Sequence, residues 1–228
     1  MLAVAFAAAT FLKHRTGVAK NSRAYAAVWD TLKSGRLPPE PTRKEPLYDR
    51  QRLIELVKQQ ALKFGDFTLA SGKKASFYLD CRKLTLDGES ANVIAAGMLD
   101  AMGDDVPDAV GGMAIGADPI SAAIITVAWQ QQKNIKGFIV RKQAKEHGTQ
   151  QMVEGPVEPG QRVVMVEDVV TTGGSSLRAI QHARDFGLKV DRLISIVNRG
   201  TESEKIFADV DVKFTALLDL ADLGIQST

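Results

Sequence analysis

Short apolar runs alternate with amphipathic stretches along the chain after Tyr48. The apolar runs lie at 109–115, 137–140, 162–166, 190–198 and about 213–220. Apolar residues at helical spacing mark the stretches 90–103, 118–132 and 175–187. Continuously apolar strands that alternate with helices are typical of a mostly parallel sheet with helices on both faces. The pattern therefore predicts an α/β fold, and such sheets bind ligands at the carboxyl ends of their strands.

A helix and a hairpin are predicted before this sheet. Residues 49–65 place most of their apolar side chains on one helical face, and Gly65 is expected to cap the helix at its C-terminus. Residues 67–80 have two strand-like arms around small polar residues at Ser71 and Gly72, which predicts a hairpin.

Capping residues predict where the later helices begin and end. Ser90 is expected to open the helix that Gly103 closes. Asp118 is expected to be the N-cap of the next helix, with Pro119 as its first residue. Gly187 is expected to close the helix that starts near residue 175.

Residues 1–47 differ in composition from the rest of the chain. Four basic residues precede the first acid, Asp30, and four of the eight prolines fall in 37–46. We expect an N-terminal extension and a proline-rich linker over 1–47, followed by one folded domain over 48–228. An extension without catalytic importance or a start assigned too far upstream is favoured, with an organelle transit segment as the alternative.

Composition narrows the class of protein. The 228 residues carry a net charge of +2, which gives no general electrostatic reason to bind nucleic acid or an acidic membrane. No apolar run is long enough to span a bilayer. The single cysteine, Cys81, excludes an internal disulfide and fits the reducing cytoplasm, where we expect the protein to act. Three scattered histidines form no zinc-binding pattern with it.

The segment 163-VVMVEDVVTTGGSS-176 combines two chemistries. Glu167 and Asp168 stand at the carboxyl end of a predicted strand, and a loop rich in Thr, Gly and Ser leads from there into a helix. Such a loop binds anions through its backbone N–H groups and the helix N-terminus. Carboxylates instead accept hydrogen bonds from sugar hydroxyls. A ribose 5-phosphate satisfies both, whereas the Walker and GxGxxG patterns are not matched.

This segment resembles the phosphoribosyl pyrophosphate (PRPP) motif of the type I phosphoribosyltransferases. The resemblance implies their Rossmann-like fold, a mostly parallel sheet flanked by helices, with a small N-terminal hood mainly over 48–85. It also implies that PRPP is bound by Glu167, Asp168, Val169, Val170, Thr171, Thr172, Gly173, Gly174 and Ser175.

A basic run follows the predicted strand 137–140. Arg141, Lys142, Lys145 and His147 fall within seven positions, and such a run is most often a solvated surface. Here it directly follows a core strand, and its RKQAKEHG sequence resembles the catalytic loop of orotate phosphoribosyltransferases. The resemblance implies that these four residues bind PRPP and neutralise the departing pyrophosphate, with Lys145, His147 and Asp168 in catalytic roles.

Three further segments are similar to the same family. The hairpin FTLASGKKASFYLD resembles part of its hood, although Ala70 stands where some members have a lysine, which leaves Lys73 and Lys74 as the two candidates to replace it. The segment 111–123 resembles the loop that holds pyrophosphate. Arg199 follows the strand 190–198, where the family places an arginine beside the carboxylate of orotate, and Thr171 is expected near orotate as well.

The resemblance implies the reaction of orotate with PRPP to give orotidine 5′-monophosphate and pyrophosphate, in the biosynthesis of UMP. It implies Mg²⁺ held mainly by PRPP and water, with no protein side chain assigned to it, and a homodimer in which the loop reaches the neighbouring subunit. Two alternatives stay open. One is a purine phosphoribosyltransferase, and the other is a PRPP-binding regulator with the same fold and no catalysis.

Overall fold

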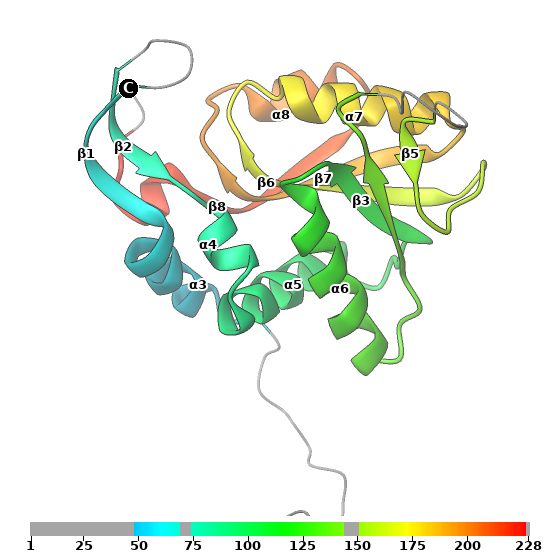
Figure 1. Cartoon of the computed structure of the whole chain (residues 1–228), viewed down its shortest axis with the longest axis horizontal. Coiled ribbons are helices and arrows are strands. Elements are labelled where there is room, and N and C mark those ends of the chain that lie inside the picture. The colour runs from blue at the N-terminus through cyan, green and yellow to red at the C-terminus, as the bar shows by residue number, and fades with distance from the viewer. Residues whose placement is uncertain (1–47, 69–73, 144–150, 227–228) are drawn as a thin grey trace, which may run out of the picture. The chain divides into compact units, whose positions relative to one another are not determined.

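The computed structural model describes residues 48–68, 74–143 and 151–226, which belong to one compact unit, Pro46–Thr228 (Figure 1). The predicted extension and linker over 1–47 lie outside the described residues. So do the predicted hairpin turn at Ser71 and Gly72 and the middle of the basic run. In the part that is described, no helix is long and apolar enough to cross a membrane.

A six-stranded sheet forms the centre of the unit, in the order β5-β4-β3-β6-β7-β8. Every neighbouring pair is parallel except β4 and β5. The strands are β3 (Ala109–Met113), β4 (Lys136–Val140), β5 (Val153–Glu154), β6 (Arg162–Val170), β7 (Lys189–Asn198) and β8 (Lys213–Asp219). The predicted α/β class and the mostly parallel sheet are therefore confirmed.

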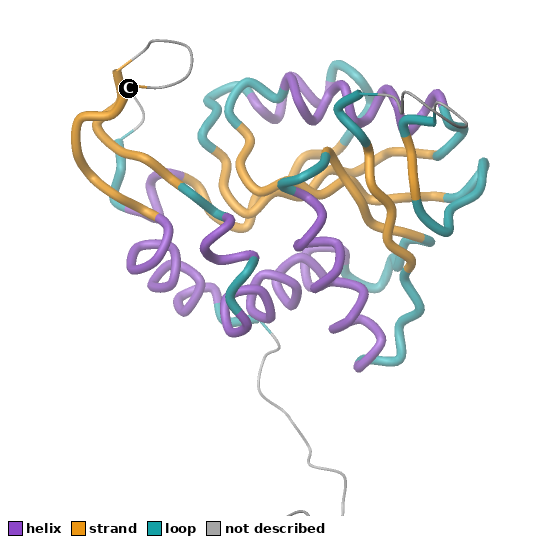
Figure 2. Tube along the Cα trace, in the orientation of Figure 1, coloured by secondary structure: helices purple, strands orange, loops and turns teal. Residues whose placement is uncertain are grey.

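Helices cover both faces of this sheet (Figures 1 and 2). One face carries α5 (Gly88–Met102) and α6 (Ala117–Gln130), and the other carries α7 (Gly174–Asp185) and α8 (Ser203–Ala208). A hydrophobic core lies on each face of the sheet, and strand β6 contributes side chains to both, because successive strand residues point to opposite faces. Val164 and Val166 belong to the core under α5 and α6, whereas Val163 and Met165 belong to the core under α7. This alternation continues into the two acids that follow them.

The segment before the sheet forms the predicted helix and hairpin with different boundaries. Helix α3 (Arg50–Leu56) continues as a π-helical turn (Val57–Ala61), and an antiparallel hairpin of β1 (Leu62–Thr68) and β2 (Lys74–Leu79) follows. Helix α4 (Arg82–Thr85) comes next, and a short 3₁₀ helix (Leu220–Leu223) ends the described fold. The predicted C-cap at Gly65 is wrong, because Leu62 already pairs with Leu79 and Gly65 lies within β1 at a bulge.

Two predicted helix starts are also wrong by a few residues. Asp87 caps α5 by accepting a hydrogen bond from the backbone N–H of Ser90, so the helix begins one turn earlier than expected. Helix α6 begins directly after Gly116, so Asp118 lies inside the first turn and caps nothing. Gly103 closes α5 as predicted, and Gly187 follows the end of α7 with a φ of 100° that favours glycine.

Candidate functional site

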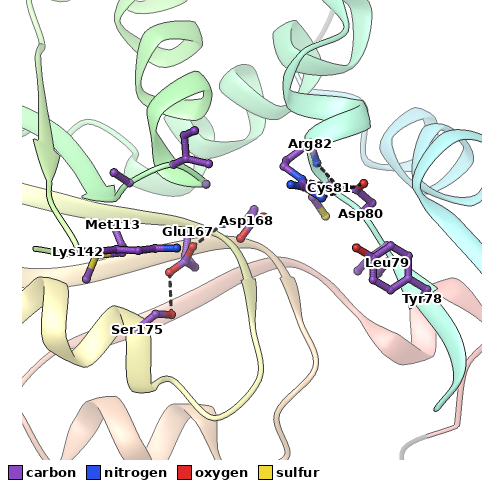
Figure 3. A pocket seen from close by; sticks show the side chains of 13 residues that line it. Tyr78, Leu79, Asp80, Cys81, Arg82, Met113, Lys142, Glu167, Asp168 and Ser175 are labelled. Carbon is purple, nitrogen blue, oxygen red and sulfur yellow. Dashed lines mark hydrogen bonds and ion pairs between the residues drawn. The ribbon is translucent and has the colours of Figure 1, made fainter. Parts of the chain in front are cut away.

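A cavity of about 300 Å³ opens at the carboxyl ends of β3 and β6, where α/β sheets bind ligands (Figure 3). Its walls come from the end of the hairpin with the start of α4, the loop before α6, the residue Lys142 after β4, strand β6 and the first turn of α7. The lining residues are Tyr78, Leu79, Asp80, Cys81, Arg82, Met113, Ala114, Ile115, Gly116, Lys142, Glu167, Asp168 and Ser175.

The two acids lie near the carboxyl end of β6, as predicted, and the strand runs on for two residues to Val170. Consecutive strand residues leave the strand towards opposite faces, although the two carboxyl groups remain close enough to interact. Glu167 points towards α7, and its side chain contacts the first turn of that helix. Asp168 lies beside Gly116 of the loop before α6. A Cβ atom on Gly116 would crowd the carboxyl group of Asp168. Both acids line one cavity from different sides (Figure 3).

Glu167 is buried, with 6% of its surface exposed. One carboxyl oxygen accepts hydrogen bonds from the hydroxyls of Ser176 at 3.0 Å and Ser175 at 3.4 Å. The other accepts a long bond of 3.3 Å from the backbone N–H of Asp168. Burial, followed by the charge of Asp168, raises the pKa of Glu167 to about 7. This carboxyl group therefore gains or loses its proton near neutral pH.

The loop between β6 and α7 has the form of an anion site. Gly173 is the N-cap of α7, with a φ of 72° in the left-handed region where glycine is favoured. The first bond of the helix runs from the N–H of Leu177 to the carbonyl of Gly173, so the N–H groups of residues 174–176 precede the helical ladder. The predicted phosphate residues from Thr171 to Ser175 thus lie next to the two acids, as the sequence indicated.

The described part of the basic run lies between two neighbouring cavities. Lys142 lines the cavity that contains Glu167 and Asp168, and Figure 3 shows its amine end directed towards Glu167. Arg141 lines a neighbouring cavity of about 640 Å³ and donates to the carboxylate of Glu154 at 2.8 Å. Lys142 lines this second cavity as well, so it lies between Arg141 and the two acids. Lys145 and His147 lie outside the described residues.

Arg199 follows β7 directly and reaches the hairpin. Its guanidinium group stacks on the ring of Phe77 in β2, 4.7 Å from the ring centroid. The Nε atom is buried and makes no hydrogen bond to any described residue. Burial lowers the pKa of this arginine. A partly buried guanidinium without an acid partner is suited to bind an anionic ligand.

Several lining residues were missed by the sequence analysis. Cys81 lines the cavity, and burial followed by the charge of Asp168 raises the pKa of its thiol. Asp80 and Arg82, which hydrogen-bond to each other at 2.9 Å, line it too. The signal for these three residues was their position directly after the hairpin. Ser176, one residue beyond the predicted phosphate loop, was missed as well, and it contacts Glu167 without lining the cavity.

The fold and the cavity define the class of protein. Residues 91–221 match the family model of the phosphoribosyl transferase domain. Within this domain, the cavity is lined by residues of the central strand β6, including the two acids, and by the first turn of α7. The predicted type I phosphoribosyltransferase fold is confirmed.

Relatives narrow the class further. The orotate phosphoribosyltransferase of Rhodopirellula baltica is 47% identical over 184 residues, which cover 78% of this chain and 95% of that protein. The crystal structure of Mycobacterium tuberculosis orotate phosphoribosyltransferase with Fe(III) dicitrate matches with a TM-score of 0.68 at 36% identity, covering 77% of this chain and 99% of that one. Its complex with PRPP matches with a TM-score of 0.65 at 32% identity over the same shares of both chains. The chain belongs to the orotate phosphoribosyltransferase family.

Proposed function

We propose that the protein transfers the 5-phosphoribosyl group from PRPP to orotate, giving orotidine 5′-monophosphate and pyrophosphate, and so acts in the synthesis of UMP. The observation that carries the proposal is the cavity in which two carboxyl groups, an anion-binding helix start and Lys142 face one another. A ribose phosphate with a pyrophosphate at C1′ has the complementary groups. The family to which the chain belongs supports orotate as the acceptor.

The proposed chemistry relies on charge and position more than on covalent attack. Glu167 and Asp168 accept hydrogen bonds from the ribose hydroxyls, and residues 171–175 donate to the 5-phosphate. Lys142 faces the pyrophosphate as it leaves. Cys81 is no nucleophile in this scheme, because its raised pKa keeps the thiol protonated. Lys145 and His147 are proposed to complete the neutralisation of pyrophosphate from the loop.

Arg199 is proposed to hold the orotate carboxylate. A guanidinium can bind a carboxylate through two parallel hydrogen bonds, which a neutral purine would not engage. The buried, unpaired Nε and the stack on Phe77 support this role. Thr171, which is exposed at the start of the phosphate loop, is proposed to contact orotate from the other side.

Mg²⁺ is proposed as the cofactor. Among the residues that the structure describes, no group of three or more His, Cys, Asp or Glu side chains is arranged to hold a metal ion. We propose that PRPP and water, more than protein side chains, would supply its ligands, which suits an ion that keeps much of its hydration shell. Its charge would stabilise the leaving pyrophosphate.

The remaining proposals concern the localisation, the oligomeric state and the partners of the enzyme. We propose a cytoplasmic homodimer in which the loop around Lys145 reaches the cavity of the neighbouring subunit. We also propose that nucleic acids and membranes are not among its partners. Analytical ultracentrifugation would test the dimer. Mixed dimers of a Lys145→Ala subunit and an Asp168→Asn subunit would test the shared loop, because one complete site would form only if loops are exchanged.

One assay tests the proposed function. The purified protein is incubated with PRPP and Mg²⁺ and with orotate, adenine, hypoxanthine or uracil, and consumption of each base is followed by its ultraviolet absorbance. We expect consumption of orotate alone. Consumption of a purine would overturn the assignment of Arg199, while binding of PRPP without turnover of any base would favour a PRPP-binding regulator.

A further inference from the structure

A single short hydrogen bond ties the acid end of the cavity to the phosphate end. The hydroxyl of Ser176 donates to Glu167 at 3.0 Å, across from the first turn of α7 to strand β6. Ser176 is the third residue of α7 after its N-cap, Gly173. It does not line the cavity itself and lies beyond residues 171–175, which were predicted to hold the phosphate. Its position is therefore that of a support behind the ligand-facing residues.

The other bonds to the Glu167 carboxyl group are weaker. Ser175 donates at 3.4 Å and the N–H of Asp168 at 3.3 Å, both near the limit for a hydrogen bond. Ser176 is 2% exposed and Glu167 is 6% exposed, so bulk water cannot replace the short bond if it is lost. A buried carboxyl group that loses its main donor either rotates or holds its proton more tightly.

We propose that Ser176 is a positioning residue of the donor site, whose hydroxyl fixes the Glu167 carboxyl group so that its other oxygen faces the ribose hydroxyls of PRPP. This inference rests on the proposed function, because it takes PRPP as the ligand of the cavity. The same bond joins the acid that receives the ribose to the helix turn that receives the 5-phosphate. Ser176 thereby sets the spacing between the two halves of one ligand.

The groups around Glu167 set the direction of the expected effect. Asp168 on the same strand disfavours its ionised form, whereas the bond from Ser176 favours it. Lys142 is directed towards it from the end of β4 (Figure 3), and the uncharged Ser195 is its register partner on β7. Removal of the Ser176 hydroxyl should therefore raise the pKa of Glu167 further. The ionised carboxylate, which is the better acceptor for ribose hydroxyls, should then form only at higher pH.

The test compares four variants of the full chain: Ser176→Ala, Glu167→Gln, the double variant, and Ser121→Ala as the matched control. Ser121 is also a buried helix serine, but its hydroxyl donates to the carbonyl of Ala117 in α6, away from Glu167. The dissociation constant for PRPP with Mg²⁺ is measured by titration calorimetry. The KM values for PRPP and orotate are measured from about pH 6 to 9.

We expect Ser176→Ala to weaken PRPP binding about tenfold, the size of one lost hydrogen bond to a charged group. The KM for orotate should stay within about twofold, and the acid limb of the profile of kcat/KM for PRPP should move to higher pH. On the Glu167→Gln background the same change should have an effect below about twofold, because the two residues act as one unit. Ser121→Ala should match the wild type in every measurement.

Different failures have different meanings. Equal PRPP binding and an unmoved pH profile in a folded Ser176→Ala variant would overturn the inference and leave the proposed function intact. Equal losses for PRPP and orotate, or an undiminished effect on the Glu167→Gln background, would show a purely structural serine and overturn it as well. A wild-type protein that does not bind PRPP would overturn the proposed function together with the inference.

Discussion

The guanidinium group of Arg199 lies over the ring of Phe77, 4.7 Å from its centroid, and so connects the end of β7 to the hairpin. The two residues are far apart in the sequence, and neither element alone would fix the plane of the guanidinium. The ring leaves the edge of the guanidinium available for hydrogen bonds, which is the edge that a carboxylate engages. Phe77 thus becomes part of the proposed orotate site without carrying a polar group.

Replacement of Phe77 should selectively weaken orotate binding. Phe77→Leu keeps an apolar side chain but removes the stack, which is worth about 0.5–1 kcal/mol at partly exposed sites. We expect the KM for orotate to rise about two- to fivefold, with the KM for PRPP unchanged. Phe64→Leu is the control, because Phe64 pairs with Phe77 across the hairpin but is exposed. An equal rise of the KM for orotate in both variants would mean that the hairpin as a whole, and not the stack of Arg199 on Phe77, causes the effect.

Two strand glycines allow a test of how closely the layers pack. A Cβ atom on Gly112 in β3 would collide with the carbonyl oxygen of Val166 and would lie 2.7 Å from the Cβ of Ala117. The neighbouring strand β4 has Gly137, where the nearest heavy atom, on Ile125, would be 3.6 Å away. We expect Gly112→Ala to lower the free energy of unfolding by about 1–3 kcal/mol or more, since backbone must move.

Gly137→Ala should leave stability within about 0.5 kcal/mol of the wild type. Urea unfolding followed by circular dichroism measures both changes. Similar losses for the two variants would mean that strand glycines matter here for backbone freedom and not for the space they leave. Such a result would contradict the close approach of β3 and β6 at Gly112.

The sheet and the position of the site were predictable because they depend on local patterns. Apolar runs specify buried strands, and Glu167, Asp168 and the glycine-rich loop occupy one continuous segment.

The Ser176–Glu167 bond was not predictable, since a serine in a first helical turn most often bonds locally. The ion pair of Arg141 with Glu154 was not predictable for a different reason. Glu154 lies on β5, which pairs with β4 from beyond the basic run, and no local pattern indicates that contact.

The wrong helix boundaries have a common physical cause. Leu62 and Phe64 fit the helical pattern of residues 49–65 as well as they fit a strand. Their pairing with β2 satisfies backbone hydrogen bonds over several residues and makes them a strand. This pairing is a contact with another segment, so it cannot be predicted from the local pattern. Asp87 competes with Ser90 as a cap in the same way, since both are good N-cap residues and only the tertiary fold selects one.

Arg192 is expected to stabilise the fold at the opposite end of the sheet from the cavity. Its guanidinium group donates to the carbonyls of Met102 at 3.1 Å and Asp105 at 2.7 Å, just where α5 ends. Because the side chain is only 15% exposed, Arg192→Met should cost about 1–2 kcal/mol and lower the Tm by a few degrees. Calorimetric melting measures this loss, while turnover should be unchanged.

Arg50→Met is the matched control for this prediction. Arg50 forms an ion pair of 2.7 Å with Asp222, but 51% of its side chain is exposed. Exposed ion pairs contribute less than about 1 kcal/mol, so its Tm should stay close to that of the wild type. If the two arginine variants melted alike, the carbonyl bonds of Arg192 would add nothing beyond an ordinary surface charge.

The buried Glu167 should make the protein less stable as the pH rises towards neutrality. Its pKa is raised from an ordinary value of 4.5 to about 7 in the folded state, chiefly by burial. Between these two values the folded protein holds a proton that the unfolded chain has released, so stability is lost as the pH rises through this window and then levels off. We expect the loss to be on the order of 3 kcal/mol.

Glu167→Gln should remove this dependence, because the amide has no proton to lose in this range. We expect the variant to melt higher than the wild type at pH 8, and the difference to shrink towards pH 5. Glu204→Gln, which changes an exposed carboxylate on α8, should follow the wild-type curve at every pH. The Tm of the three proteins is measured without ligand between pH 5 and 8. A constant difference between wild type and Glu167→Gln across that range would mean that Glu167 is ionised throughout, and that α7 stabilises its charge despite the burial.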